Sequence, residues 1–415
     1  MKVEMKYIQL LSLYLGLVAF GVVVLPKMTG LFLLGLIIIV VYGFIKKELI
    51  FKLNKLGSLF ILMYLAFLIG TLFTHNTPLA LRYVENKLSY LLFPLLFSFK
   101  PKEELKLNWS YIGFISGTLL ITILGLVKGI YCYLGPTGTR GCILASSVSP
   151  FIHPTYLSVY LMISIGIVLK GWKENWLYFN KKWMIPFLIF AILMQGLLLS
   201  LSGILFLFIL IGIYCLYWLK KKVNKLMFYA SILILPLIGY FSITNIPQIE
   251  GEWYNAKWYA DEYLKSPDAF VKSRVYPMSG TEVRIVMWTA AVKAIQKHPF
   301  GVGTGNVDEY LAKELNLLNQ NELAKEELNP HNQFFQTTLE IGVFGILILL
   351  SIIGYGFYTA FKENDYLLML IVGSLFFNSL FESMLQRHSG IVIYTFWICL
   401  LSILYLNKEK DQKIG

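Results

Sequence analysis

Residues 183–219 read WMIPFLIFAILMQGLLLSLSGILFLFILIGIYCLYWL and contain no aspartate, glutamate, lysine or arginine. About 20 apolar residues are enough for a helix to cross the core of a bilayer, so this run is too long for one span. Small and polar residues at Ser200, Ser202 and Gly203 permit a tight turn inside it. We therefore expect two membrane-spanning helices that meet at this turn.

Apolar stretches of similar character recur along the whole chain. Of its 415 residues, 57% are hydrophobic and 14% are charged, and the mean hydropathy is +0.65, more than a soluble globular domain requires. The sequence predicts an all-α, polytopic bundle of about twelve transmembrane spans. The expected spans are residues 8–25, 28–45, 56–73, 88–99, 109–131, 152–169, 183–199, 201–219, 226–244, 334–357, 366–381 and 391–406.

This pattern divides the chain into three parts. Residues 1–244 hold spans one to nine, residues 245–333 form one large periplasmic loop with short helices, and residues 334–415 hold the last three spans and a cytoplasmic tail. The span at 88–99 is short and could begin near Leu79. The first span has no small-residue cleavage site behind it and leads directly into the second, so we expect no removable signal peptide.

Basic residues predict the orientation. Lysines dominate the short loops on the side of both termini, which marks that side as cytoplasmic. Every arginine and histidine falls on the other side: Arg82, Arg140, Arg274, Arg284, Arg387, His75, His153, His298, His331 and His388. The net charge of +12 is thus an orientation signal. The large outer loop has more acidic than basic residues, so we expect no nucleic-acid partner.

The four cysteines fall into two groups. Cys215 and Cys399 lie inside predicted spans, where a cysteine behaves as a small hydrophobic residue. Cys132 and Cys142 flank a glycine-containing loop on the outer side, in a compartment where disulfides persist. A disulfide and two free thiols are both compatible with this pair.

The outer loop contains three recognisable segments. Aromatic residues crowd positions 253–263, where they could stack on sugars or form an interfacial belt. Apolar residues with helical spacing at 281–297 predict an amphipathic helix that carries Arg284 and ends before Pro299. The stretch FGVGTGN at 300–306 predicts a glycine turn, with Asn306 as the N-cap of a following helix. This turn lacks the Lys-Ser or Lys-Thr of a nucleotide-binding loop.

One histidine precedes the tenth span in a distinctive setting. The sequence EELNPHNQFFQTTLEIGVFG, residues 326–345, leads from the outer loop into the membrane. Taken alone, a histidine such as His331 at a helix start is more often a cap or a surface residue. Its order with Arg284 and the glycine turn changes that interpretation.

The ordered set of motifs resembles the O-antigen ligase and polymerase superfamily. The resemblance depends on Arg284 and Trp288, on PFGVGTGN at 299–306, and on Pro330-His331-Asn332 followed by EIGVFG at 340–345. It implies a metal-independent glycosyltransferase of the GT-C type, without a cofactor, in the bacterial inner membrane with its active site facing the periplasm. The expected donor is a glycan on undecaprenyl pyrophosphate. The expected acceptor is lipid A-core for a ligase, another glycan for a polymerase, or a protein for some relatives.

The chemistry of the outer residues agrees with this resemblance. A guanidinium binds the oxygens of a diphosphate in bidentate fashion, so Arg284 is the first candidate for the leaving group. A neutral histidine accepts the proton of an attacking hydroxyl, so His331 is the candidate base. Further candidates for pyrophosphate or glycan binding are Arg82, Arg387, His388, Glu382 and His153.

Several of these weaker candidates have alternative explanations. Arg82 and Arg387 could complete the anion site or contact lipid headgroups. Glu382 could orient His331 or pair with Arg387. Glu340, inside the tenth span, could make a bundle-facing hydrogen bond or take part in function, as intramembrane carboxylates often do.

One departure from the family pattern concerns the turn at 200–203. Many relatives carry a Ser-Arg-Gly-like turn there, and this chain has Gly203 where that arginine would fall. The other functional classes are a membrane transporter, which would place its ionisable groups nearer the membrane centre on repeated helices, and a scaffold or sensor. Within the enzyme class, ligase, polymerase and protein glycosyltransferase share these motifs.

Overall fold

Most described residues of the computed structural model are helical. The structure describes residues 6–405 apart from 137, 175, 177–180 and most of 223–246. The N-terminal part contains α1 Tyr7–Val24, η1 Pro26–Met28, α2 Thr29–Ile45, β1 Leu49–Phe51, α3 Lys55–Gly70, η2 Thr71–Phe73, α4 Thr77–Asn86, α5 Ser89–Phe97, β2 Phe99–Pro101, α6 Asn108–Leu134, η3 Arg140–Ile143, η4 Ala145–Val148, α7 Pro154–Lys173, α8 Lys181–Leu197 and α9 Leu201–Lys222. The C-terminal part contains α11 Pro247–Lys265, α12 Pro267–Lys272, α13 Gly280–Lys297, α14 Val307–Leu317, α15 Asn321–Lys325, α16 Gln333–Lys362, α17 Tyr366–Ser379 and α18 His388–Ile403.

The helix lengths confirm an all-α membrane protein but support the predicted count of twelve spans only in part. Among the described residues, six helices are long and apolar enough to cross a membrane: those at Tyr7–Val24, Pro26–Ile45, Lys55–Phe73, Asn108–Leu134, Pro154–Lys173 and Gln333–Lys362. Shorter apolar helices lie at Lys182–Leu197, Leu201–Ile213, Tyr366–Ser379 and His388–Ile403. The predicted span at 226–244 lies almost entirely outside the described residues.

The predicted span at 88–99 contains the nine-residue helix α5. Helix α4 precedes it from Thr77, but the two are separated by a break at Lys87 and Leu88. The side chain of Lys87 is only 1% exposed and pairs with Glu340 of α16. A buried charge is strongly destabilising unless it is paired with an opposite charge. The pair between Lys87 and Glu340 lies at the break between α4 and α5, which the apolar pattern did not predict.

The bundle and the outer segment have separate hydrophobic cores. In the bundle, α1 packs along α6, α3 and α17 both pack against α16, and α18 packs on α5. Helices α11 to α15 bury a second cluster that includes Phe270, Met287 and Leu311 and extends to Leu339 of α16. We call α11 to α15 the outer unit.

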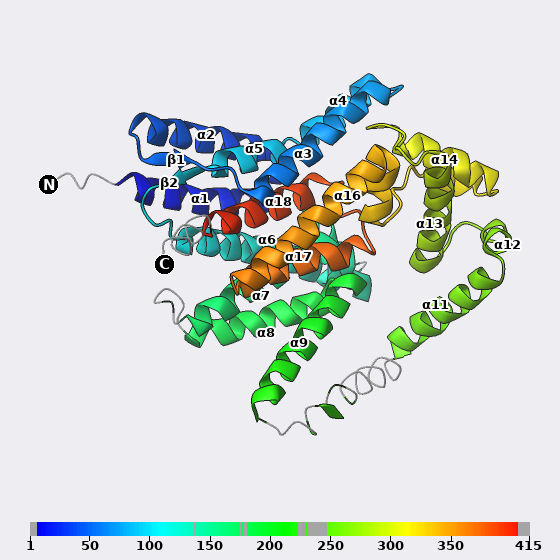
Figure 1. The fold of residues 1–415 in the computed structure, drawn as a ribbon. Coiled ribbons are helices and arrows are strands. Elements are labelled where there is room, and N and C mark those ends of the chain that lie inside the picture. Colours follow the sequence, from blue (N-terminus) through cyan, green and yellow to red (C-terminus); the bar gives the residue numbers. More distant parts are fainter. Residues whose placement is uncertain are drawn as a thin grey trace.

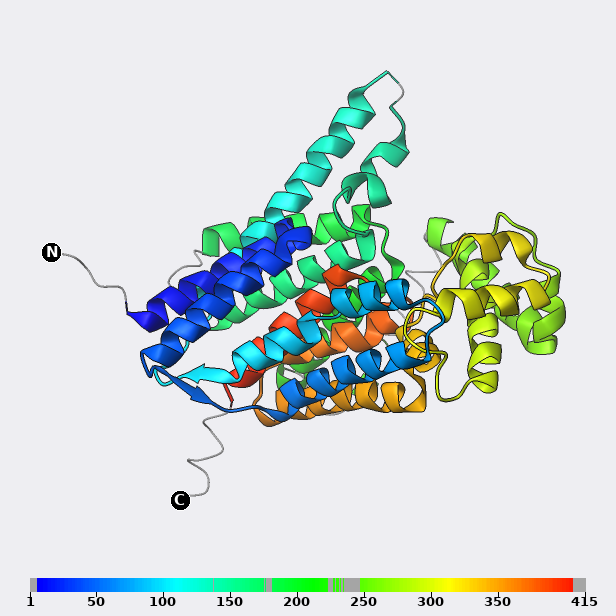
Figure 2. The same ribbon diagram turned by 90° about the horizontal axis from the view of Figure 1, so that it is seen from above.

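The outer unit lies at one end of the bundle (Figures 1 and 2). Helix α1 begins and α18 ends at the opposite end, beside the two short strands (Figures 1 and 2). These strands pair antiparallel, with Ile50 opposite Lys100. The loop between α2 and β1, which carries Lys46 and Lys47, thus lies at the end opposite the outer unit, whose helix α13 carries Arg284.

The turn predicted at Ser200 separates α8 from α9. Helix α8 ends at Leu197 and α9 begins at Leu201. Gly203 then lies against α7, because a Cβ added there would come within 1.9 Å of the Ser158 hydroxyl oxygen. That hydroxyl donates to Gln195 of α8 at 2.6 Å. The position where many relatives carry arginine is therefore a close contact between helices in this chain.

Candidate active site

The loop between α17 and α18, residues 380–387, is where most of the candidate residues meet. We call it the α17–α18 loop. Arg284 of α13 donates from Nε to the Phe381 carbonyl oxygen at 3.4 Å. Asn332 donates to the Leu380 carbonyl at 3.1 Å, and Gln333 accepts from the Leu385 amide at 2.6 Å. This loop therefore connects the outer unit to the start of α16.

His331 lies immediately before α16 in a left-handed backbone conformation, with φ +48°. Its successor, Asn332, caps the helix by accepting from the amides of Phe334 and Phe335. The imidazole Nδ1 of His331 lies 3.2 Å from Glu382 Oε2. The His331 side chain is 23% exposed and that of Glu382 is 11% exposed. The imidazole is thus accessible while the carboxylate behind it is largely buried.

Glu382 is held in its charged form. Burial alone would raise its pKa, but the hydrogen bond from His331 brings the pKa below its usual value. The charges that His331 and His153 carry when protonated, and the charge of Arg284, act in the same direction. A carboxylate that accepts from Nδ1–H fixes the tautomer in which Nε2 carries a free lone pair. The geometry therefore gives His331 one nitrogen able to accept a proton.

Arg284 lies in the second turn of α13, and the start of that helix is well defined. Ser279 and Glu282 form a capping box, in which each side chain accepts from the other residue's backbone amide. Besides its contact with Phe381, Arg284 donates from Nη1 to the Gly280 carbonyl at 3.3 Å. These two contacts direct the guanidinium toward the α17–α18 loop and leave further N–H groups for an anion.

His153 and Arg387 belong to the same electrostatic environment. Burial lowers the pKa of His153, the Glu382 carboxylate opposes this shift, and the charge of Arg387 reinforces it. His331 and Arg284 lower the pKa of His153 as well. His153 precedes α7, and the neighbouring Tyr156 donates to the Ser383 carbonyl at 3.3 Å. The structure thus brings His153, Arg284, His331, Glu382 and Arg387 together.

Two other predicted residues, Arg82 and His388, make no recorded contact with these five residues in the described part of the chain. Arg82 lies on the exposed side of α4. His388 is the first residue of α18 and is half-buried. Arg274, although an outer arginine, pairs with Glu282 at 3.3 Å and lies over the ring of Phe270 at 4.5 Å, so it stabilises the outer unit.

Three polar residues that contact candidate residues were not predicted. Asn329 and Ser383 contact one another at 3.0 Å beside His331. Lys87, which the pattern placed in a loop, lies 3.5 Å from Glu340, and Gln336 donates to the other oxygen of Glu340 at 3.2 Å. Glu340 therefore makes the bundle-facing contacts that were one of its two predicted explanations. The role of Lys87 could not be predicted locally, because its partner Glu340 is far away in the sequence.

The glycine turn holds a break in α16. Gly301, Gly303 and Gly305 all have φ near +90°, and the helix is interrupted at Ile341 and Gly342. The Val302 amide donates to the Leu339 carbonyl at 2.8 Å, and the Gly303 amide donates to that of Glu340 at 3.1 Å. The turn thus replaces helical hydrogen bonds that the break removes. It joins the outer unit to the helix that begins beside His331.

Replacing Gly342 with alanine is expected to destabilise the protein. Gly342 has φ +72° and ψ −165°, a conformation essentially confined to glycine that costs other residues about 1–3 kcal/mol. A Cβ there would also lie 2.3 Å from the Phe300 carbonyl carbon. Gly354→Ala in the same helix is the matched control, because a Cβ there has open space around it. Thermal unfolding in detergent should show a clear loss for Gly342→Ala only; equal unfolding temperatures would contradict this account of the break.

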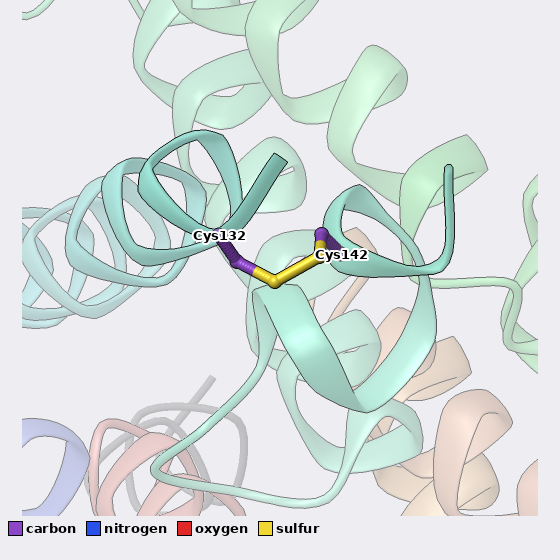
Figure 3. Close-up of a disulfide and its surroundings, with 2 residues drawn as sticks. All are labelled: Cys132 and Cys142. Atoms are coloured by element: carbon purple, nitrogen blue, oxygen red, sulfur yellow. A yellow bond between two sulfur atoms is a disulfide. The ribbon is translucent and has the colours of Figure 1, made fainter. Parts of the chain in front are cut away.

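Cys132 and Cys142 form a disulfide, with their Cα atoms 5.6 Å apart (Figure 3). Cys132 lies in the last turn of α6 and Cys142 in η3, which packs against that helix. Of the two alternatives that the sequence left open, the structure has the bridged one. The other two cysteines are free.

The family model described as O-antigen ligase matches residues 186–350. This segment belongs to the O-antigen ligase and polymerase superfamily. The resemblance drawn from the motifs is thereby confirmed, and the superfamily is one of glycosyltransferase-like enzymes. No curated protein matches the chain. The ligase-family segment includes Arg284, the glycine turn and His331, whereas Glu382, Arg387 and His153 lie outside it and join the site through the fold.

Proposed function

We propose that this protein is a periplasm-facing glycosyltransferase of the inner membrane that moves a glycan from undecaprenyl pyrophosphate to an acceptor hydroxyl. The most specific form of the proposal is an O-antigen ligase with lipid A-core as the acceptor. One observation carries the proposal: Arg284 and His331 contact consecutive residues of the α17–α18 loop, Phe381 and Glu382. A guanidinium and an imidazole with a free Nε2 at one location suit a diphosphate leaving group and an attacking alcohol.

The reaction assigns a separate task to each group. The acceptor hydroxyl attacks the anomeric carbon and passes its proton to Nε2 of His331. The bond between that carbon and the phosphate oxygen breaks, and its electron pair leaves with the pyrophosphate. Arg284 neutralises the charge that grows on the leaving oxygen, and the exposed Arg387 is available to do the same. Glu382 stabilises the imidazolium that forms.

Metal independence is part of the same proposal. Charge on a pyrophosphate is neutralised either by a divalent cation or by arginine and lysine side chains. Arg284 and Arg387 supply such charges, and both act electrostatically on His153, as His331 does. A transfer assay that keeps its full rate in excess chelator would support this part of the proposal, and a loss of rate that Mg²⁺ restores would contradict it.

The orientation of the protein follows from the charge distribution at its two ends. Short loops rich in lysine occupy the end at which α1 begins, which supports a cytoplasmic location for both termini. The outer unit and the candidate site occupy the other end (Figure 1). Reaction on the periplasmic side would give the enzyme access to donors displayed on the outer leaflet.

The test of the proposed function is a strain that lacks the gene, examined by lipopolysaccharide gel. A ligase predicts loss of all long glycan from lipid A-core while the lipid-linked polymer still accumulates. A single repeat attached to the core would instead indicate a polymerase. An unchanged lipopolysaccharide pattern with loss of a glycoprotein would indicate protein glycosylation, and an unchanged pattern with the lipid-linked glycan trapped on the cytoplasmic face would indicate transport.

A further inference from the structure

Four hydrogen bonds close a ring around the candidate base. The His331 amide donates to Asn329 Oδ1 at 2.9 Å, and the Ser383 hydroxyl donates to the same oxygen at 3.0 Å. The Ser383 amide donates to Glu382 Oε1 at 3.3 Å, and His331 Nδ1 lies 3.2 Å from Glu382 Oε2. The ring thus joins the backbone of His331 to its own side chain through three other residues.

The hydrogen bond from the His331 amide supports an unfavourable backbone conformation. A histidine with φ +48° lies in the left-handed region, which non-glycine residues occupy at a cost unless their surroundings hold them there. The bond from its amide to Asn329 is the local contact that supports this conformation. Ser383 in turn holds the Asn329 amide group, and it is itself 1% exposed. The orientation of Asn329 therefore depends on the α17–α18 loop.

We infer that Asn329 and Ser383 are positioning residues, which hold the imidazole of His331 against Glu382 by fixing the backbone of the base to the loop that carries its carboxylate. This inference rests on the proposed function, because it assigns these residues to the reaction through His331. Neither side chain supplies a proton or a charge. They raise the fraction of molecules in which Nε2 of His331 points at the acceptor hydroxyl.

Loss of either residue should lower kcat and leave the KM for the donor unchanged. The donor is bound by the arginines, which stay in place, whereas misplacing a catalytic group by about 1 Å can cost on the order of 10²-fold in rate. For the loss of one hydrogen bond in the ring we expect a fall in kcat of about tenfold. A role confined to folding would instead reduce the amount of active protein and leave the kcat per folded molecule unchanged.

The experiment compares Ser383→Ala, Asn329→Ala and the double variant with the wild-type protein, all purified in detergent and quantified as folded protein. The donor is the lipid-linked glycan extracted from the deletion strain. Because both residues act through one ring, the double variant should lose little more than the worse single variant. Ser379→Ala is the matched control, since this buried serine at the end of α17 has no hydrogen-bond partner among the described residues.

The outcomes separate this inference from the proposed function. An unchanged kcat in both single variants, a rise in KM at constant kcat, or losses that multiply in the double variant would each overturn the positioning role, even if His331→Ala is inactive. If the wild-type protein transfers no glycan, or if His331→Ala transfers it normally, the proposed function fails and the positioning role fails with it.

Discussion

Replacement of His331 by alanine is expected to abolish glycan transfer while the protein still inserts and accumulates. A positioned general base contributes about 10²- to 10⁴-fold to a rate, and the imidazole is the only proton acceptor that we assign to the acceptor hydroxyl. The accumulation of the variant should be normal because the Asn332 cap and the bonds from Asn332 and Gln333 to the α17–α18 loop do not involve the imidazole. Lipopolysaccharide gels of the complemented deletion strain, with immunoblots of its membranes, measure both quantities.

The matched control for this variant is His75→Ala. His75 belongs to the same outer set of histidines, but its side chain is exposed in the loop before α4. It should complement the deletion fully. Long glycan on lipid A-core in the His331→Ala strain, at the level of the control, would remove the base from the mechanism and leave only the structural role of a residue before a helix.

Glu382→Gln should have a smaller effect of the same kind. The neutral amide can still accept a hydrogen bond from Nδ1–H, but it no longer stabilises the imidazolium. Because the pKa of Glu382 lies below its usual value, its carboxylate is charged at neutral pH and its charge is lost only as the pH falls through that lowered pKa. We therefore expect a kcat loss of about 10- to 100-fold at neutral pH. A wild-type rate would contradict the role of this carboxylate.

Local chemistry explains why much of the helical layout could be predicted. The turn between α8 and α9 falls at small polar residues, and α13 ends at Lys297, two residues before Pro299. Both boundaries depend on residues within one helical turn. The helix at Val307 was predicted in the same way, although the Asn306 side chain does not cap it and instead bonds to Thr74 and to the carbonyls of Phe73 and Val302.

Features set by distant partners could not be predicted. Lys87 directly follows α4, and its partner Glu340 lies 253 residues further along the chain. In the sequence, Gly203 is only a departure from a family pattern. In the fold, α9 approaches Ser158 of α7 at this glycine. Neither the residues around Lys87 nor those around Gly203 indicate these contacts on their own.

The candidate site also combines residues that the sequence could identify with residues that only the fold identifies. Arg284 and His331 could be found from their order along the chain, which the resemblance supplied. Glu382 was one of several weaker candidates, because a carboxylate at the end of a span suits several explanations. Asn329 and Ser383 were missed because short polar residues in loops are common, and only the ring that they close with His331 distinguishes them.

Replacement of Arg284 by alanine is expected to reduce kcat/KM for the lipid-linked donor by about 10²- to 10³-fold, the range seen when one charge-stabilising donor is removed. Arg284→Lys should recover only part of this loss, since an ammonium keeps the charge but lacks the planar fork that matches two phosphate oxygens. Arg140→Ala is the matched control, because Arg140 is exposed in the disulfide loop. Assays of donor dependence with the wild-type protein and these three variants measure the effect.

Inhibition by inorganic pyrophosphate tests the same residue without reference to the rate of transfer. If Arg284 binds the leaving group, pyrophosphate should compete with the donor in the wild-type protein and in Arg140→Ala, and about tenfold more of it should be needed in Arg284→Ala, which corresponds to about 1.4 kcal/mol of binding. The contacts of Arg284 with Phe381 and Gly280 are long, at 3.4 and 3.3 Å, so the guanidinium can exchange them for a stronger anion. Equal inhibition of all three proteins would mean that Arg284 only links α13 to the α17–α18 loop, and the charge on the leaving group would have to be neutralised by other residues.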